Sequence, residues 1–152
     1  MKLDRQLEVL INDAAKYGVA PEAVEKALAP VIKLFAQQLQ HTKYYVLQNL
    51  EQDWVLTTIT NSQSQQVKKV IYAFVSVQDA AGFQKQAKSD LIAMPIDIVQ
   101  LLFRLFSLQQ VDSIIFLENS PNLDRGVEIE REHLARSIEQ QIQQLRIPPN
   151  LA

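Results

Sequence analysis

The residues of this sequence best suited to chemistry are a short run of carboxylates and two imidazoles. Glu128, Glu130 and Glu132 alternate directly before His133, and both carboxylate and imidazole groups are ligands for divalent metals. On a helix, only Glu130 and His133 would share a face, and one such pair needs further ligands from other segments. We therefore expect no metal site. Instead, we predict that the acidic run opens the terminal helix, where negative charge complements the positive end of the helix dipole.

The other groups that could support catalysis are missing or isolated. The chain has no Cys, which excludes thiolate nucleophiles and Cys-bound metal centres. His41 has no second ligand at helical or hairpin spacing, and the sequence has neither a glycine-rich phosphate loop nor a nucleophile elbow. We expect no catalytic, cofactor-binding or metal-binding residues. The alternative is a metal-dependent hydrolase or a ligand-binding enzyme, which would need its candidate acids to converge in one pocket: Asp53, Asp97, Glu118 and Asp124.

The composition argues against two classes of partner. The 152 residues include 15 basic and 17 acidic side chains, so the chain has no excess positive charge to neutralise a nucleic-acid backbone. Lys68, Lys69 and the single Trp54 do not make a nucleic-acid platform either, because neighbouring side chains of a strand point to opposite faces. No run approaches the roughly 20 apolar residues of a membrane span, and the start lacks the apolar core of a signal peptide. We expect a cytoplasmic protein that binds neither nucleic acid nor membrane.

Apolar spacing predicts a pair of helices in residues 1–40. The first covers about residues 3–17 and ends at Gly18, a residue type favoured in the left-handed conformation that closes helices. The second begins at Pro21, since proline suits a first helical position. Pro30 lies inside the second helix and predicts a kink or a break, because proline removes a backbone hydrogen bond.

The pattern changes after this helix pair to β-branched and aromatic runs separated by polar turns. Residues 43–77 are typical of a three-stranded meander, with strands expected at 44–50, 54–60 and 67–77. Residues 78–147 then predict a helix, a strand, a helix, a strand and a long helix, at 79–88, 90–94, 95–108, 111–118 and 130–146. We predict one α+β domain over residues 1–152, with an antiparallel or mixed sheet of about five strands flanked by helices.

The predicted helix at 95–108 is apolar around most of its circumference. A helix that only covered a sheet would need an apolar stripe about 100° wide, so this helix needs a second cover. The N-terminal helix pair of the same chain is the ordinary candidate, and another chain is the alternative. In the second case the protein-binding surface is formed by Leu101, Leu102, Leu105 and Phe106.

The predicted terminal helix has the opposite character. Its apolar stripe is thin, and Gln residues cover much of the remaining surface. Such a surface could recognise a polar partner, but we interpret it as a solvated face.

Five segments of the second half of the chain follow a known order of elements. They are Tyr72-Ala73-Phe74-Val75-Ser76, Gln78-Asp79-Ala80-Ala81-Gly82-Phe83, Leu91-Ile92-Ala93-Met94, Pro95-Ile96-Asp97 and Ile114-Ile115-Phe116-Leu117-Glu118-Asn119-Ser120-Pro121. This order resembles the N-terminal domain of the SseB family (enhanced serine sensitivity protein) and, more broadly, the fold of type III secretion chaperones. The chain also resembles small cyanobacterial proteins with this chaperone-like fold. The resemblance implies a role in binding proteins and carries no catalytic residues.

These observations lead to one hypothesis about function. We predict a non-enzymatic protein-binding module, chaperone-like or an assembly factor, that forms a homodimer. The wide apolar helix, the lack of catalytic groups and the family resemblance all favour it.

Overall fold

The computed structural model describes residues 2–60, 63–83, 91–118 and 126–146. The fold is α+β, with a mixed sheet of six strands flanked by helices. Its helices are α1 (Lys2–Asn12), α2 (Pro21–Ala23), α3 (Ala29–Ala36), α4 (Val77–Phe83), α5 (Ile98–Ser107) and α6 (Arg131–Arg146). Its strands are β1 (Lys43–Gln48), β2 (Thr57–Thr60), β3 (Val67–Phe74), β4 (Ile92–Asp97), β5 (Ser113–Leu117) and β6 (Gly126–Glu130). The α+β prediction with a mixed sheet and N-terminal helices is confirmed.

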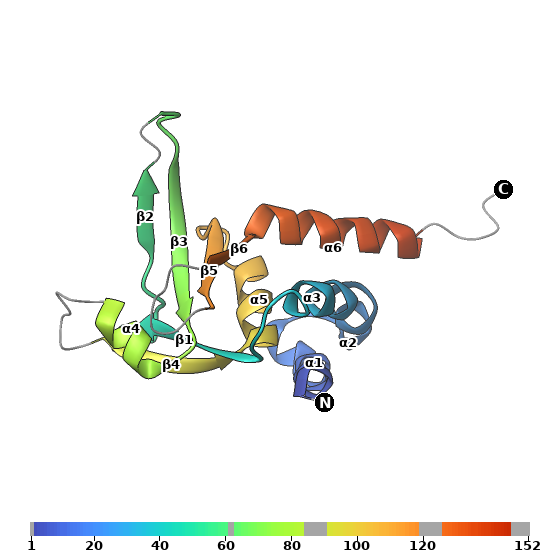
Figure 1. The fold of residues 1–152 in the computed structure, drawn as a ribbon. Coiled ribbons are helices and arrows are strands. Elements are labelled where there is room, and N and C mark those ends of the chain that lie inside the picture. The colour runs from blue at the N-terminus through green and yellow to red at the C-terminus, as the bar shows by residue number, and fades with distance from the viewer. Residues whose placement is uncertain (1, 61–62, 84–90, 119–125, 147–152) are drawn as a thin grey trace.

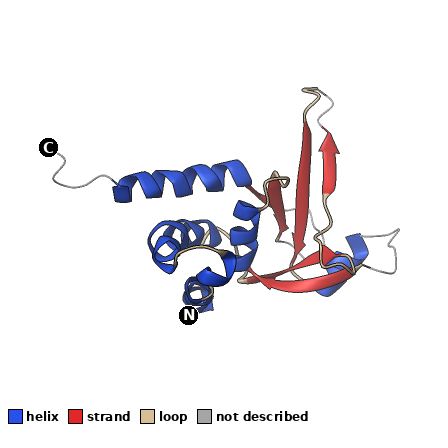
Figure 2. Cartoon of the chain, turned by 180° about the vertical axis from the view of Figure 1, so that it is seen from behind, coloured by secondary structure: helices blue, strands red, loops and turns tan. Residues whose placement is uncertain are grey.

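The sheet separates a thick helical layer from a thin one. Its strands follow the order β4-β1-β3-β5-β6, and β2 pairs with the first half of β3. Among the strand pairs in the described residues, β3 and β5 run parallel and the others antiparallel. Helices α1, α3, α5 and α6 lie on one side of the sheet, which we call the inner face, and α4 lies on the other, the outer face (Figures 1 and 2). The β2–β3 arm projects beyond both layers (Figure 1).

The meander predicted for residues 43–77 is only partly correct. The chain turns back on the end of β1, with a bridge between Gln48 and Trp54 and a hydrogen bond from the Val55 N–H to the Leu47 carbonyl at 2.9 Å, but β2 itself does not pair with β1. The reason is that both edges of β1 are occupied, one by β4 along its whole length and the other by the end of β3. Strand β2 therefore pairs with the first half of β3.

The boundary between β4 and α5 lies later than the sequence predicted. Pro95 belongs to β4, where it pairs with Tyr45, and a proline is tolerated there because β4 is an edge strand. Helix α5 begins after Asp97, whose side chain makes no capping hydrogen bond. The side chain of Gln6, on α1, caps the helix in place of Asp97. The amide oxygen of Gln6 accepts the N–H of Val99 at 3.1 Å, and the amide nitrogen of Gln6 donates to the carbonyl of Thr42 at 2.9 Å.

The acidic run before α6 is a strand rather than the start of a helix. In β6, Val127 and Ile129 contact the inner core, while Glu128 and Glu130 alternate with them and reach Lys68 on the outer face. The helix-dipole interpretation is therefore wrong for Glu128 and Glu130. It remains suitable for Glu132, which lies in the first turn of α6.

The N-terminal helices confirm two predictions and refine a third. Gly18 adopts a left-handed conformation (φ 73°) after a 3-10 turn, and Pro21 opens α2. At Pro30 the helix neither breaks nor stops, because a wider π-helical turn over Val24–Leu28 leads into α3. The carbonyl of Lys26 cannot receive an N–H from Pro30, four residues on. The Gln141 side chain of α6 donates to that carbonyl at 3.1 Å.

This contact gives a testable prediction. Gln141→Leu should lower the free energy of unfolding by about 1 kcal/mol, the usual net value of one hydrogen bond. In a Pro30→Ala background the helix supplies its own donor, so Gln141→Leu should cost less there. Chemical denaturation of the four proteins of this double-mutant cycle measures the difference. Gln144→Leu, an exposed change on the same helix, is the control. Equal costs in both backgrounds would show that the amide does not compensate for the proline.

Candidate protein-binding surface

The apolar side of α5 is covered from within the chain. Leu101, Leu102 and Leu105 are fully buried, and Phe106 keeps partial exposure. Helices α1, α3 and α6 all contact α5, so the N-terminal helix pair supplies the cover that the sequence required. A partner that contacted the three leucines would first have to displace these helices.

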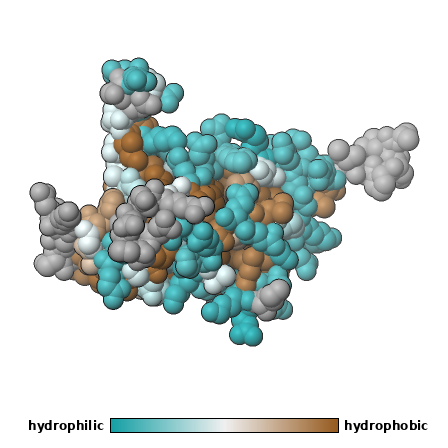
Figure 3. All heavy atoms as spheres, in the orientation of Figure 1, coloured by the Kyte–Doolittle hydropathy of each residue, from teal (hydrophilic) through white to brown (hydrophobic). Residues whose placement is uncertain are grey.

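The outer face of the sheet is less well covered. A small core is formed there by Leu47, Phe74 and Leu117 of the strands together with Ala80 of α4. Around it are partly exposed side chains that we call the outer patch: Tyr45, Val55, Tyr72, Phe83 and Ile115. In the space-filling view, hydrophobic residues also gather along the β2–β3 arm below its polar tip (Figure 3).

Phe83 is the most prominent member of the outer patch. Its ring contacts those of Tyr72 and Phe74, with centroids 4.8 and 5.2 Å apart, yet 44% of the residue is exposed. A shallow hollow of about 110 Å³ lies beside it, lined also by Val55 and Thr57. Exposed aromatic side chains around such a hollow are typical of the centre of a protein interface.

A charged cluster lies beside the outer patch. Lys68 contacts Glu128 and Glu130, each at 3.1 Å, and Ser113 donates to Glu128 at 2.6 Å. The hydrogen bond from Ser113, followed by the contact with Lys68, lowers the pKa of Glu128 below its usual range. The pKa of Lys68 is raised, first by its hydrogen bond to Glu128 and then by that to Glu130. The patch therefore has an apolar centre and, on this side, a rim that carries both signs of charge.

The candidate acids of the alternative hypothesis do not come together in the described residues. Asp53 lines one cavity and Asp97 another, on different parts of the fold. Glu118 is buried in a third place, where it accepts hydrogen bonds from the Tyr44 hydroxyl and the Gln40 backbone N–H. Asp124 lies outside the described residues. Across the described parts of the chain, no group of three or more His, Asp or Glu side chains could hold a metal ion.

The two histidines lie on different elements. His41 precedes β1, and its ring packs edge-on against Tyr44 at 5.6 Å. His133, on α6, packs in the same edge-on way against Phe35, with ring centroids 5.1 Å apart. Each imidazole thus has an aromatic neighbour.

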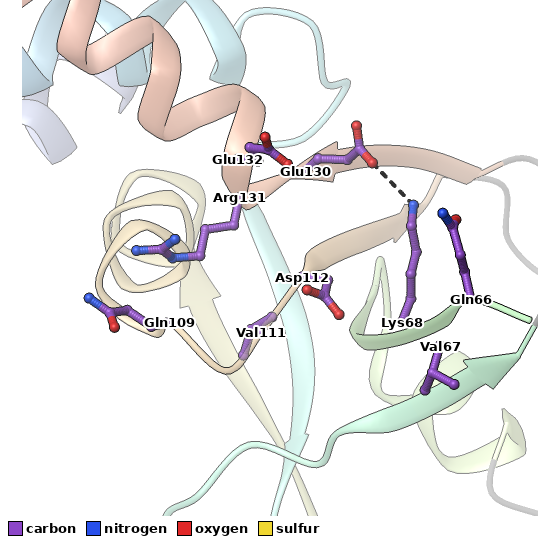
Figure 4. A pocket seen from close by; sticks show the side chains of 9 residues that line it. All are labelled: Gln66, Val67, Lys68, Gln109, Val111, Asp112, Glu130, Arg131 and Glu132. Carbon is purple, nitrogen blue, oxygen red and sulfur yellow. Dashed lines mark hydrogen bonds and ion pairs between the residues drawn. The ribbon is translucent and has the colours of Figure 1, made fainter.

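The cavity between the arm and α6 has a volume of about 470 Å³ (Figure 4). Most of its charged groups are already paired: Lys68 with Glu130, and Glu132 with Arg136 of its own helix. Asp112 accepts the backbone N–H of Lys69 at 2.8 Å. Arg131 is the exception, because its buried Nε has no hydrogen-bond partner.

Sequence reasoning missed the outer patch. Its residues come from β1, β3, α4, β5 and the β1–β2 connection, and no stretch of sequence shows that they share a face. The one sequence signal is that the second half of β3 is apolar at both parities, which is typical of a strand covered on both faces.

No helix in the described part of the chain is long and apolar enough to cross a membrane. No protein-family model and no curated protein matches the sequence.

Proposed function

We propose that the chain is a non-enzymatic protein-binding module, chaperone-like or an assembly factor, and that it forms a homodimer through the outer patch. The observation that carries this proposal is the exposed aromatic surface around Phe83 on the thinly covered sheet face. The resemblance to the SseB N-terminal domain and to secretion chaperones supports the same class of function.

The partner that the patch fits best is a second copy of the chain. A two-fold interface brings the same surface of two molecules together. A charged side chain in it therefore faces either the same residue of the second molecule or a neighbouring residue of opposite charge. The rim offers both signs side by side, in Lys68 and its two glutamates. The apolar centre supplies the surface that loses contact with water on association.

A substitution at Phe83 tests this proposal. Phe83→Glu should convert a dimeric parent into a folded monomer, because association would bury a carboxylate in an apolar contact. Sedimentation equilibrium measures the change in mass, and far-ultraviolet circular dichroism shows that the fold is retained. The matched control is Leu34→Glu, since Leu34 on α3 is 62% exposed and lies in the helical layer. That variant should dimerise like the parent.

Two results would overturn the proposed dimer. One is a parent chain that remains monomeric from micromolar to millimolar concentration. The other is a Phe83→Glu variant that dimerises as tightly as the parent.

A further inference from the structure

A second cavity, of about 340 Å³, lies where the connection between β1 and β2 meets the end of α5. Its volume is at the lower end of the range for small-molecule sites, about 300 to 1,000 Å³. Four of its eight lining residues are apolar, namely Leu56, Ile71, Leu108 and Val111. The remaining lining residues are Asp53, Trp54, Arg104 and Gln110. Small-molecule sites combine apolar side chains with polar groups that orient the ligand, and this cavity offers both.

Two polar side chains at this cavity lack the partners that their chemistry calls for. Trp54 is only 8% exposed, and its indole N–H has no hydrogen-bond acceptor. An unsatisfied buried donor is unfavourable, so native structures usually supply an acceptor. The guanidinium carbon of Arg104 lies 4.4 Å from the centre of the Trp54 ring. Arg104 forms no ion pair with any carboxylate that the structure describes.

We propose that this cavity binds a small aliphatic carboxylate. The ligand carboxylate accepts hydrogen bonds from Arg104, whose planar fork of donors matches a carboxylate, and from the indole N–H of Trp54. The aliphatic tail packs against Ile71 and Val111, which are buried in the cavity wall. Asp53 is exposed among the lining residues, where an ammonium group next to the carboxylate would meet a negative charge.

The single tryptophan makes the site directly observable. The chain contains one Trp, so proton–nitrogen correlation spectra show one indole resonance. Isocaproate is the first probe, and isocaproamide is its uncharged counterpart of the same shape. L-leucine has the same carbon skeleton with an added ammonium group. We expect the indole resonance to move saturably with isocaproate and to respond at least about ten-fold more weakly to the amide, which loses a charge-assisted hydrogen bond.

Variants assign the effect to Arg104. Arg104→Leu should weaken isocaproate binding about 10- to 100-fold, the usual value of a hydrogen bond to a charged group. Arg104→Lys keeps the charge but loses the fork, and should bind several-fold more weakly than the parent. The control is Arg136→Leu, because Arg136 is exposed and pairs with Glu132 on its own helix. The dispersion of the backbone amide resonances of each unliganded variant shows whether it is folded.

The two other arms identify the ligand class more closely. If L-leucine binds more tightly than isocaproate and Asp53→Asn removes the advantage, the ligand is an amino acid. If isocaproate binds more tightly, the ligand is a simple carboxylic acid. Both outcomes support a carboxylate site.

Three outcomes would overturn the proposal. They are an indole resonance that isocaproate does not move, equal binding of the acid and the amide, and unchanged binding by a folded Arg104→Leu variant. The cavity is lined by Trp54 and Ile71 of the inner core, and the outer patch lies on the other face of the sheet. Failure of the carboxylate site would therefore leave the proposed dimer untouched.

Discussion

Replacing Leu105 with glutamate is expected to leave the chain unfolded. Leu105 is fully buried in the inner core, and α5 is in contact with α1, α3 and α6. An unpaired carboxylate at that place would lose its hydration without gaining a partner. Truncation of such a residue to alanine typically costs about 2 to 5 kcal/mol, and a buried charge adds to that loss. Domains of this size are stable by only about 5 to 15 kcal/mol.

Two measurements check this expectation. Far-ultraviolet circular dichroism should show that Leu105→Glu lacks the helical signal of the parent. Leu105→Ala should fold, and urea denaturation should give a loss of about 2 to 5 kcal/mol in the free energy of unfolding. Leu34→Glu, at an exposed position on α3, should change it by less than about 0.5 kcal/mol. A folded, monomeric Leu105→Glu protein from a dimeric parent would instead place the interface on α5.

Local signals predicted the helical half of the fold well. Gly18 and Pro21 have conformational preferences that hold regardless of distant contacts, and both lie where their chemistry suggested. Pro30 was also correctly identified as a perturbation. The sequence did not show that the helix would continue through Pro30. The Lys26 carbonyl that the proline leaves free is bonded by Gln141 of α6, which lies 115 residues further along the chain.

Strand pairing was harder to predict than helix position. Strand β6 contains only two apolar residues that face the core, Val127 and Ile129, and these lie among glutamates that equally suit a helix N-terminus. Proline is common at the first position of a helix, so the sequence predicted a helix start at Pro95. It can instead belong to β4 because β4 is an edge strand, which the local sequence does not show. In both cases the local structure depends on the position of a neighbouring strand, which the local sequence does not predict.

The candidate sites show the same limitation. Trp54 showed no partner in the sequence, yet the fold places the guanidinium carbon of Arg104 at 4.4 Å from the centre of its ring. The acids of the alternative hypothesis looked equivalent, yet Glu118 is buried with specific donors while Asp53 is exposed. Residue types identified the side chains that could take part in binding or catalysis. Only the tertiary contacts showed which of these side chains lie next to one another.

The second large effect is expected at the buried pair of Tyr44 and Glu118. Glu118 follows β5 and is almost fully buried. Its carboxylate accepts the Tyr44 hydroxyl and the backbone N–H of Gln40, the latter at 2.8 Å. This arrangement ties the segment after α3 to the centre of the sheet. Tyr44→Phe would leave the buried carboxylate without one of its donors, at a cost of about 1 to 3 kcal/mol at neutral pH. Tyr17→Phe, which removes an exposed hydroxyl, should cost less than about 0.5 kcal/mol.

The same pair should make stability depend on alkaline pH. Burial, the hydrogen bond to Glu118 and the negative charge of Glu118 raise the pKa of Tyr44 far above its usual range. In the unfolded chain the phenol loses its proton near pH 10, whereas in the folded chain it remains protonated. The unfolded state therefore binds fewer protons above pH 10, and the stability contributed by Tyr44 falls by about 1.4 kcal/mol per pH unit there. Below pH 10 that contribution is complete.

Denaturation curves from pH 8 to 11.5 separate this effect from the loss of a hydrogen bond. Tyr44→Phe should be less stable than the parent at pH 8, and the difference should shrink above pH 10, because the variant has no phenol at this position to ionise. A difference that stays constant across the range would mean that Tyr44 has the same pKa in the folded and unfolded chain. The contact with Glu118 would then not favour the protonated phenol in the folded chain, and the proposed cause of the alkaline pH dependence would be wrong.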